Sequence, residues 1–162
     1  MMHISLYDAP SSNVSPIHNN SQLPLLFFFS IAVVDMTRWI MTYIDTSRVA
    51  YEGARYAAGV KDLTEAVAIV DPYGEDTIPS EAHGKVVTRL QRVLTEQEMS
   101  VESTYLRIER TDPDTTNSVE VEVRVAFEPF AMRFTGGLFE SLKQFTICRY
   151  LVTAPYLFPA DS

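Results

Sequence analysis

The chain has 162 residues, the size of one ordinary domain, so it requires neither a second domain nor a metal to stabilise its core. Its formal net charge of −8 argues against a nucleic-acid partner, because phosphate binding needs clustered Lys and Arg. The single cysteine, Cys148, excludes an internal disulfide and a cysteine zinc site, and His3, His18 and His83 are too few for a histidine-rich metal centre, so we expect no metal and no cofactor.

The N-terminal part of the chain changes character abruptly. Residues 1–22 are rich in Ser, Asn and Pro and lack Lys and Arg, which predicts a flexible segment. Residues 23–34 then read LPLLFFFSIAVV, and apolar residues continue to position 44. A bilayer needs about 20 residues of helix, so residues 23–44 are long enough to span one. The side chains that we expect to contact lipid are Leu23, Leu25, Leu26, Phe27, Phe28, Phe29, Ile31, Val33 and Val34.

The same apolar stretch is compatible with two structures that do not span a membrane. A core helix of a soluble protein has this pattern over a short run, although the uniform Leu and Phe favour lipid. A secretory signal peptide has a basic start and a small-residue cleavage site, and neither is present here. Within the stretch, Asp35 and Arg38 are spaced to pair on one helical face, and Trp39 and Tyr43 suit a membrane interface.

The helix is expected to continue beyond the apolar run, over residues 23–59. Residues 45–58 contain no proline, and Gly59 is typical of a helix C-terminus. Small residues recur on one side of this extension, which permits close approach of another backbone. The side chains that we expect at an interface with another protein are Ile40, Ala50, Gly53, Ala54 and Ala57.

The remainder, residues 60–162, predicts a small extracytoplasmic α+β domain. Turn signals in residues 60–80 indicate a loop with one short helix at 63–70, and Ser80 is a suitable N-cap for an amphipathic helix over 81–98. Strands are expected at 104–109, 119–127 and 145–157, with a turn at 112–114. Residues 119–127 alternate Val or Phe with Glu, Arg or Ala, so one face is core and the other solvated. The predicted fold is α+β: a long N-terminal transmembrane helix, then an amphipathic helix on a short antiparallel sheet.

The segment 22–59 resembles the N-terminal module of TadE-like proteins. The resemblance is carried by Leu23-Pro24 before the apolar run, by Asp35 and Arg38, and above all by residues 52–58, EGARYAA. TadE-like proteins are minor pilins or pilin-like components of Tad (Flp, type IVc) pilus machinery. The resemblance implies a single-pass inner-membrane protein with an extracytoplasmic C-terminal domain. Its implied partners are membrane lipid and other pilus or secretion-machinery proteins.

Two features depart from that family. Pilin-like members carry a small residue and a glutamate before the apolar run for prepilin peptidase, whereas this chain has IHNNSQ at 17–22, so no processing site is assigned. Lys and Arg are absent before the span and follow it at Arg38, Arg48 and Arg55, which by the positive-inside rule alone favours a cytoplasmic C-terminal domain.

Catalytic signatures are absent from the sequence. There is no phosphate-binding glycine loop, nucleophile elbow or His-Glu-x-x-His helix. Glu81 near His83 is the nearest approach to a catalytic pair, but such a pair is common at solvated helix starts, so we interpret it as a charged first helical turn. Cys148 is expected to be a buried apolar group. We therefore predict a structural protein with no enzymatic activity and no small-molecule substrate.

Two alternatives belong to other functional classes. A membrane-tethered extracytoplasmic binding or sensory module would need a pocket with convergent polar groups, and the sequence indicates none. A soluble enzyme would need the apolar stretch to form a buried helix in its hydrophobic core.

Overall fold

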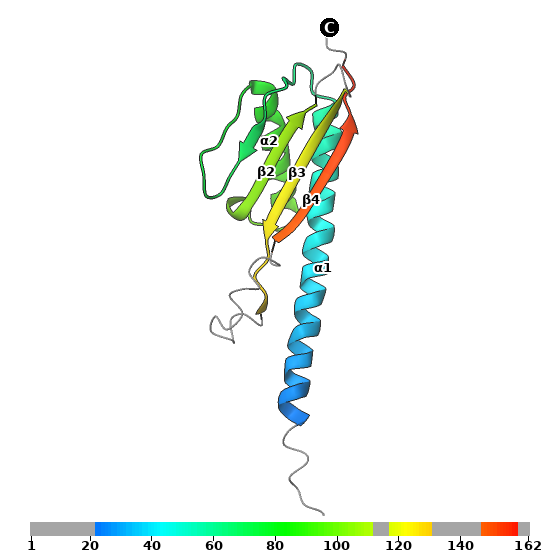
Figure 1. Cartoon of the computed structure of the whole chain (residues 1–162), viewed down its shortest axis with the longest axis vertical. Helices are drawn as coiled ribbons and strands as arrows, with labels where there is room; N and C mark the ends of the chain where they lie inside the picture. The colour runs from blue at the N-terminus through cyan, green and yellow to red at the C-terminus, as the bar shows by residue number, and fades with distance from the viewer. Residues whose placement is uncertain (1–21, 112–116, 131–146, 159–162) are drawn as a thin grey trace, which may run out of the picture.

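The computed structural model describes residues 22–111, 117–130 and 147–158 of the chain. Figure 1 shows a long helix standing beside a sheet, with a second helix behind it. The predicted flexible segment and the predicted turn at 112–114 lie outside the described residues, except for Gln22, which is helical. In chain order the elements are α1 (Gln22–Ala58), β1 (Ala68–Val70), α2 (Glu81–Glu96), the short 3₁₀ helix η2 (Val101–Ser103), β2 (Thr104–Arg110), β3 (Ser118–Ala126) and β4 (Ile147–Pro155).

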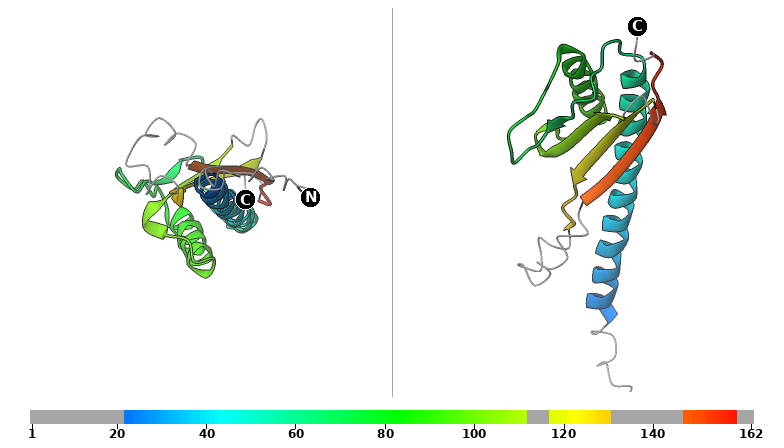
Figure 2. Two further views of the ribbon diagram at one scale, coloured as in Figure 1. Left: turned by 90° about the horizontal axis from the view of Figure 1, so that it is seen from below. Right: turned by 45° about the horizontal axis from the view of Figure 1, so that its top comes forward.

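The sheet has a simple antiparallel order within the described residues. Its four strands follow the sequence, β1-β2-β3-β4. The register places Leu106 opposite Val123 and Val121 opposite Val152, so the apolar side chains of neighbouring strands share one face. Figure 2, seen from below, shows α1 and α2 on the same side of the sheet. The predicted α+β fold is confirmed.

Helix α1 has two halves with different surroundings. It runs for 37 residues, about 55 Å at the usual rise per residue. The first half extends beyond the sheet, as Figure 1 shows, whereas the second half packs against β3, β4 and α2. The buried residues of α1 other than Asp35 are all in this second half. A long apolar N-terminal helix packed on an antiparallel sheet is a pilin-like architecture.

The core forms where the second half of α1 meets the sheet and α2. Gly53 lies at a close approach: a Cβ atom built there would overlap with Leu90 Cδ2 in α2 and lie 3.2 Å from Val121 Cγ1 in β3. Both neighbours are fully buried. A larger side chain would therefore separate α1 from both partners at once.

Helix α2 supplies the other wall of the core. Ser80 is its N-cap, as predicted, and its hydroxyl accepts a hydrogen bond from the His83 backbone N–H at 3.4 Å. Val86, Leu90 and Leu94, spaced four apart, are fully buried. The amphipathic pattern thus places one stripe of α2 against α1 and the sheet.

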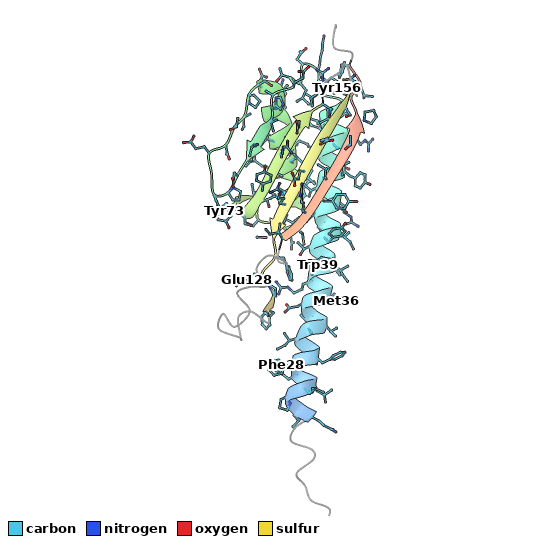
Figure 3. All side chains as sticks on the ribbon, viewed as in Figure 1. Phe28, Met36, Trp39, Tyr73, Glu128 and Tyr156 are labelled. Carbon is cyan, nitrogen blue, oxygen red and sulfur yellow. The ribbon has the colours of Figure 1, made fainter. Side chains whose placement is uncertain are left out.

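The C-terminal end of the described chain ties the far end of α1 to the domain. The Tyr156 hydroxyl donates to the Val60 carbonyl at 2.9 Å and accepts from the Leu63 N–H at 3.2 Å. The Leu157 N–H donates to the Ala58 carbonyl at 3.1 Å. Figure 3 labels Tyr156 at this end of the molecule, opposite the end where Phe28 projects.

The predicted short helix at 63–70 is wrong. Leu63 is buried in a loop, and Ala68–Val70 forms β1, which pairs with β2. Ile69 and Val70 are β-branched residues that suit a strand, and β2 offers a free edge for them. An isolated antiparallel β-bridge pairs Ile69 with Thr77, so the chain folds back on itself between β1 and α2.

Replacing Gly53 with leucine should destabilise the fold strongly. The added side chain has no space between Leu90 and Val121, and overpacking of this kind costs about 1 to 3 kcal/mol. Urea denaturation of the full chain in detergent, monitored by circular dichroism, should show a lower midpoint for Gly53→Leu than for the wild type. The matched control is Glu52→Leu, which adds the same side chain at the neighbouring exposed position. Equal midpoints for the two variants would contradict the close contact.

Candidate interaction surfaces

The projecting half of α1 is an exposed apolar surface. In the described part of the chain, α1 is the one helix long and apolar enough to cross a membrane, and very little of its apolar stretch is buried. Length, composition and N-terminal position fit a single membrane span or a signal sequence. Ile31 is half-buried, and the other predicted lipid-facing residues are exposed: Leu23, Leu25, Leu26, Phe27, Phe28, Phe29, Val33 and Val34.

Asp35 is the first buried residue along α1. Its carboxylate accepts a hydrogen bond from the Phe130 backbone N–H at 2.7 Å, and Arg38 Nη1 lies 3.6 Å from it, as predicted for this pair. The Arg38 guanidinium also lies 5.4 Å from the Phe127 ring centroid. The segment after β3 is therefore tied to α1 through a polar contact.

The position of Asp35 determines how much of α1 extends beyond the domain before the first buried contact. Residues 22–34 provide about 20 Å of helix, whereas a hydrocarbon core is about 30 Å thick. Exposed apolar side chains continue along α1 at Met36, Ile40 and Met41. A complete span would therefore include Asp35, whose charge is paired and hydrogen-bonded as an acid at membrane depth requires.

Four of the five predicted interface residues lie inside the domain. Ala50, Gly53, Ala54 and Ala57 are buried in the contact of α1 with α2 and the sheet, so they cannot contact a separate protein in the folded chain. The small residues do permit a close helix contact, but the partner is the chain's own domain. Ile40 is 41% exposed and remains available for an interface.

An aromatic stripe runs along the seam between α1 and β4. Trp39 stacks on Tyr43 with ring centroids 5.8 Å apart, Tyr43 meets Tyr150 at 5.5 Å, and Tyr150 meets Tyr51 at 6.0 Å. Trp39, Tyr43 and Tyr51 are between 39% and 59% exposed. The sequence indicated only Trp39 and Tyr43, because Tyr150 joins them from a distant strand.

The sheet face opposite the helices carries a charge cluster. Glu122 in β3 is only 1% exposed, although the alternating pattern predicted a solvated face there. Arg124 Nε lies 2.7 Å from its carboxylate, and Arg149 of β4 forms a second ion pair with it. The Arg124 guanidinium also lies 4.5 Å from the Tyr105 ring centroid. Long arginine side chains thus cover the carboxylate.

Two opposing effects act on the Glu122 pKa. Burial alone would raise it, but the neighbouring Arg124 and Arg149 guanidinium groups together lower it below its ordinary value of 4.5. The charged form is therefore favoured in the folded protein. The resulting stabilisation is present above pH 4.5 and is lost as the pH falls through the lower folded pKa.

The candidate catalytic pair does not assemble. Glu81 is 87% exposed at its side chain and pairs with Lys85 at 2.9 Å. His83 is fully buried, with Nδ1 2.8 Å from the Ser80 hydroxyl, and burial lowers its pKa. Cys148 is buried as predicted, which raises its pKa. Among the described residues, no group of three or more His, Cys, Asp or Glu side chains is placed to hold a metal ion.

Comparisons of the chain with protein-family models, with curated proteins and with solved structures find no match. Membership of the TadE-like family is therefore a hypothesis carried by the residues quoted above, chiefly 52–58.

Substituting Glu122 with glutamine should destabilise the domain in a pH-dependent manner. The variant loses both ion pairs, and removing one partner of a buried charged hydrogen bond costs about 1 to 3 kcal/mol. The difference from wild type should be full at pH 7 and should shrink below pH 4.5, where Glu122 itself becomes protonated. Denaturant titrations of both proteins at pH 7, 5 and 3 measure this difference in the free energy of unfolding. Glu120→Gln, on the same strand and face, is the control and should change stability little; a pH-independent loss for Glu122→Gln would refute a stabilising role of the ion pairs.

Proposed function

We propose that this chain is a membrane-anchored minor pilin-like structural protein of a Tad/Flp (type IVc) pilus or its associated secretion machinery. The observation that carries the proposal is the division of α1. Its first half exposes Phe27, Phe28 and Phe29 at 57% to 67%, whereas one face of its second half is buried in the domain. One continuous helix thus joins an apolar anchor to a folded domain.

The continuity of α1 gives the proposal its mechanism. The helix has no break between Gln22 and Ala58, and its second half contacts β3, β4 and α2. A domain held this way cannot rotate freely about its anchor, as a domain on a flexible linker does. The anchor therefore fixes the orientation in which the sheet, the aromatic stripe and Ile40 meet other subunits. Function in this proposal comes from packing and docking.

The orientation across the membrane follows from the resemblance to TadE-like proteins. In that family the C-terminal domain is extracytoplasmic. The positive-inside rule favours the reverse, and labelling of the domain separates the two orientations.

Anchorage and orientation can be tested in one experiment. Tyr73 is 90% exposed on the loop before α2, so Tyr73→Cys should react with a membrane-impermeant maleimide on intact cells, or on spheroplasts where an outer membrane is present. The protein should stay in the pellet after an alkaline carbonate wash. Adding Phe28→Asp and Val33→Asp should release it, because charges within a span are costly.

The unmodified chain is the matched control for labelling, because Cys148 is buried and should not react. Labelling of Tyr73→Cys only after lysis of the cells or spheroplasts would place the domain in the cytoplasm. Release of the parent chain by carbonate would remove the anchor from the proposal.

The assembly role predicts specific partners. Affinity purification of the full chain from detergent-solubilised membranes should recover pilus or pilus-assembly proteins. Ile40→Ala should lower that recovery at least fivefold, about 1 kcal/mol, because Ile40 is the predicted interface residue that stays exposed in the folded chain. Met41→Ala removes a similar exposed apolar side chain from a different side of α1 and is the control. Recovery of no pilus component would overturn the assembly role.

A further inference from the structure

A groove lies between the second half of α1 and the first turns of α2, at the end of the domain away from the projecting apolar segment. Its volume is about 1080 Å³. Gly59 and Gly84 contribute no side chain to its lining, and Tyr56, Val60 and Ile78 give it an apolar part. The groove is open to solvent rather than enclosed, so a segment of another chain can enter it.

The charge of this lining is opposite to that of the whole protein. Four basic side chains, Arg55, Lys85, Arg89 and Arg92, line the groove together with two acidic ones, Glu52 and Glu81. In the complete chain, by contrast, acidic residues outnumber basic ones by 21 to 13. The groove is therefore a basic strip on an acidic protein, and it would attract a segment of negative charge.

Three of the four basic side chains in the groove have no ion-pair partner among the described residues. Lys85 pairs with Glu81 at 2.9 Å. Arg55, Arg89 and Arg92 form no side-chain hydrogen bond or ion pair with any other residue that the structure describes. Guanidinium groups bind carboxylates in a two-pronged geometry that lysine cannot reproduce. Their convergence from two helices on one groove favours carboxylate recognition.

The position of the groove argues against a lipid headgroup as the occupant. Arg55 follows Ile44, the last residue of the predicted span, by about 16 Å of helix. The headgroup layer adds only about 5 to 8 Å to the hydrocarbon core on each side. If residues 23–44 lie in lipid, as the proposed function requires, Arg55 stands clear of the chain's own membrane. A protein segment can reach it, whereas a headgroup of that membrane cannot.

We propose that the groove between α1 and α2 docks an acidic, partly apolar segment of a partner protein. Carboxylates of that segment pair with Arg55, Arg89 and Arg92, and an apolar side chain lies on Tyr56, Val60 and Ile78. The exclusion of lipid rests on the proposed function, but the charge and shape of the groove do not.

The test uses the full chain in micelles of a zwitterionic detergent, where anchorage plays no part. The probe is a fluorescent decapeptide of alternating glutamate and leucine, and the matched probe has glutamine in place of glutamate. Fluorescence anisotropy should show binding of the acidic peptide that weakens as salt rises from about 50 to about 300 mM. The glutamine peptide should bind at least tenfold more weakly.

Arg89→Gln combined with Arg92→Gln should weaken binding of the acidic peptide at least tenfold without changing the thermal midpoint of the domain. Arg48→Gln is the control, because Arg48 lies on α1 outside the groove and pairs with Asp45. Equal binding by the groove variant, or equal binding of the two peptides, would overturn the proposal.

Two other occupants give distinct results that would also overturn it. In the first case, the wild-type chain self-associates in sedimentation, the groove variant does not, and self-association blocks binding of the peptide. This result would assign the groove to a second copy of the chain. Binding to phosphatidylglycerol vesicles that depends on Arg89 and Arg92 would assign it to lipid. Because none of these measurements uses the cell membrane, a failed peptide test leaves the membrane-anchor experiment unaffected.

Discussion

The close contact of α1 with α2 and β3 at Gly53 is the constraint on which the rest of the structure depends. The missing side chain at this position lets Leu90 and Val121 reach the helix backbone, so three elements share one point of contact. The neighbouring Ala50, Ala54 and Ala57 continue this close packing. Because the packing against α2 and the sheet uses the second half of α1, the part of the helix before Asp35 extends beyond the domain, and most of its apolar side chains are exposed.

A second contact fixes the domain to the helix further down. The Asp35 carboxylate receives the Phe130 N–H and lies near Arg38, so the segment after β3 is held beside α1 about five turns below Gly53. At the opposite end, Tyr156 binds the loop that follows α1. The domain therefore contacts α1 or the loop that follows it at three levels, so the helix and the domain form one packed unit rather than an anchor and a tethered head.

Local patterns predicted most of the elements, and long-range packing decided what they missed. Composition and periodicity placed α1, α2 and the β2–β3 hairpin nearly to their ends, since these patterns are properties of a contiguous segment. Residues 68–70 become a strand only because β2 offers an edge. The residue pattern of β3 alone predicts that Glu122 is solvated, whereas in the fold Arg149 of β4 covers its carboxylate. The small-residue strip predicted a close helix contact correctly, but nothing in its spacing says which chain supplies the partner.

The distribution of paired charges suggests which surfaces are available for assembly. On the open sheet face, Glu122 is neutralised by Arg124 and Arg149 within the chain, so a partner would have to break existing ion pairs to use these groups. The guanidinium groups of Arg55, Arg89 and Arg92 have no such partners among the described residues, and pairing them with an incoming carboxylate breaks nothing. The aromatic stripe follows the seam between α1 and β4, whereas the groove lies between α1 and α2. In the proposed subunit, the apolar and aromatic surface along α1 and the basic groove at the far end of the domain are chemically different, so the two proposed contacts would select different neighbours.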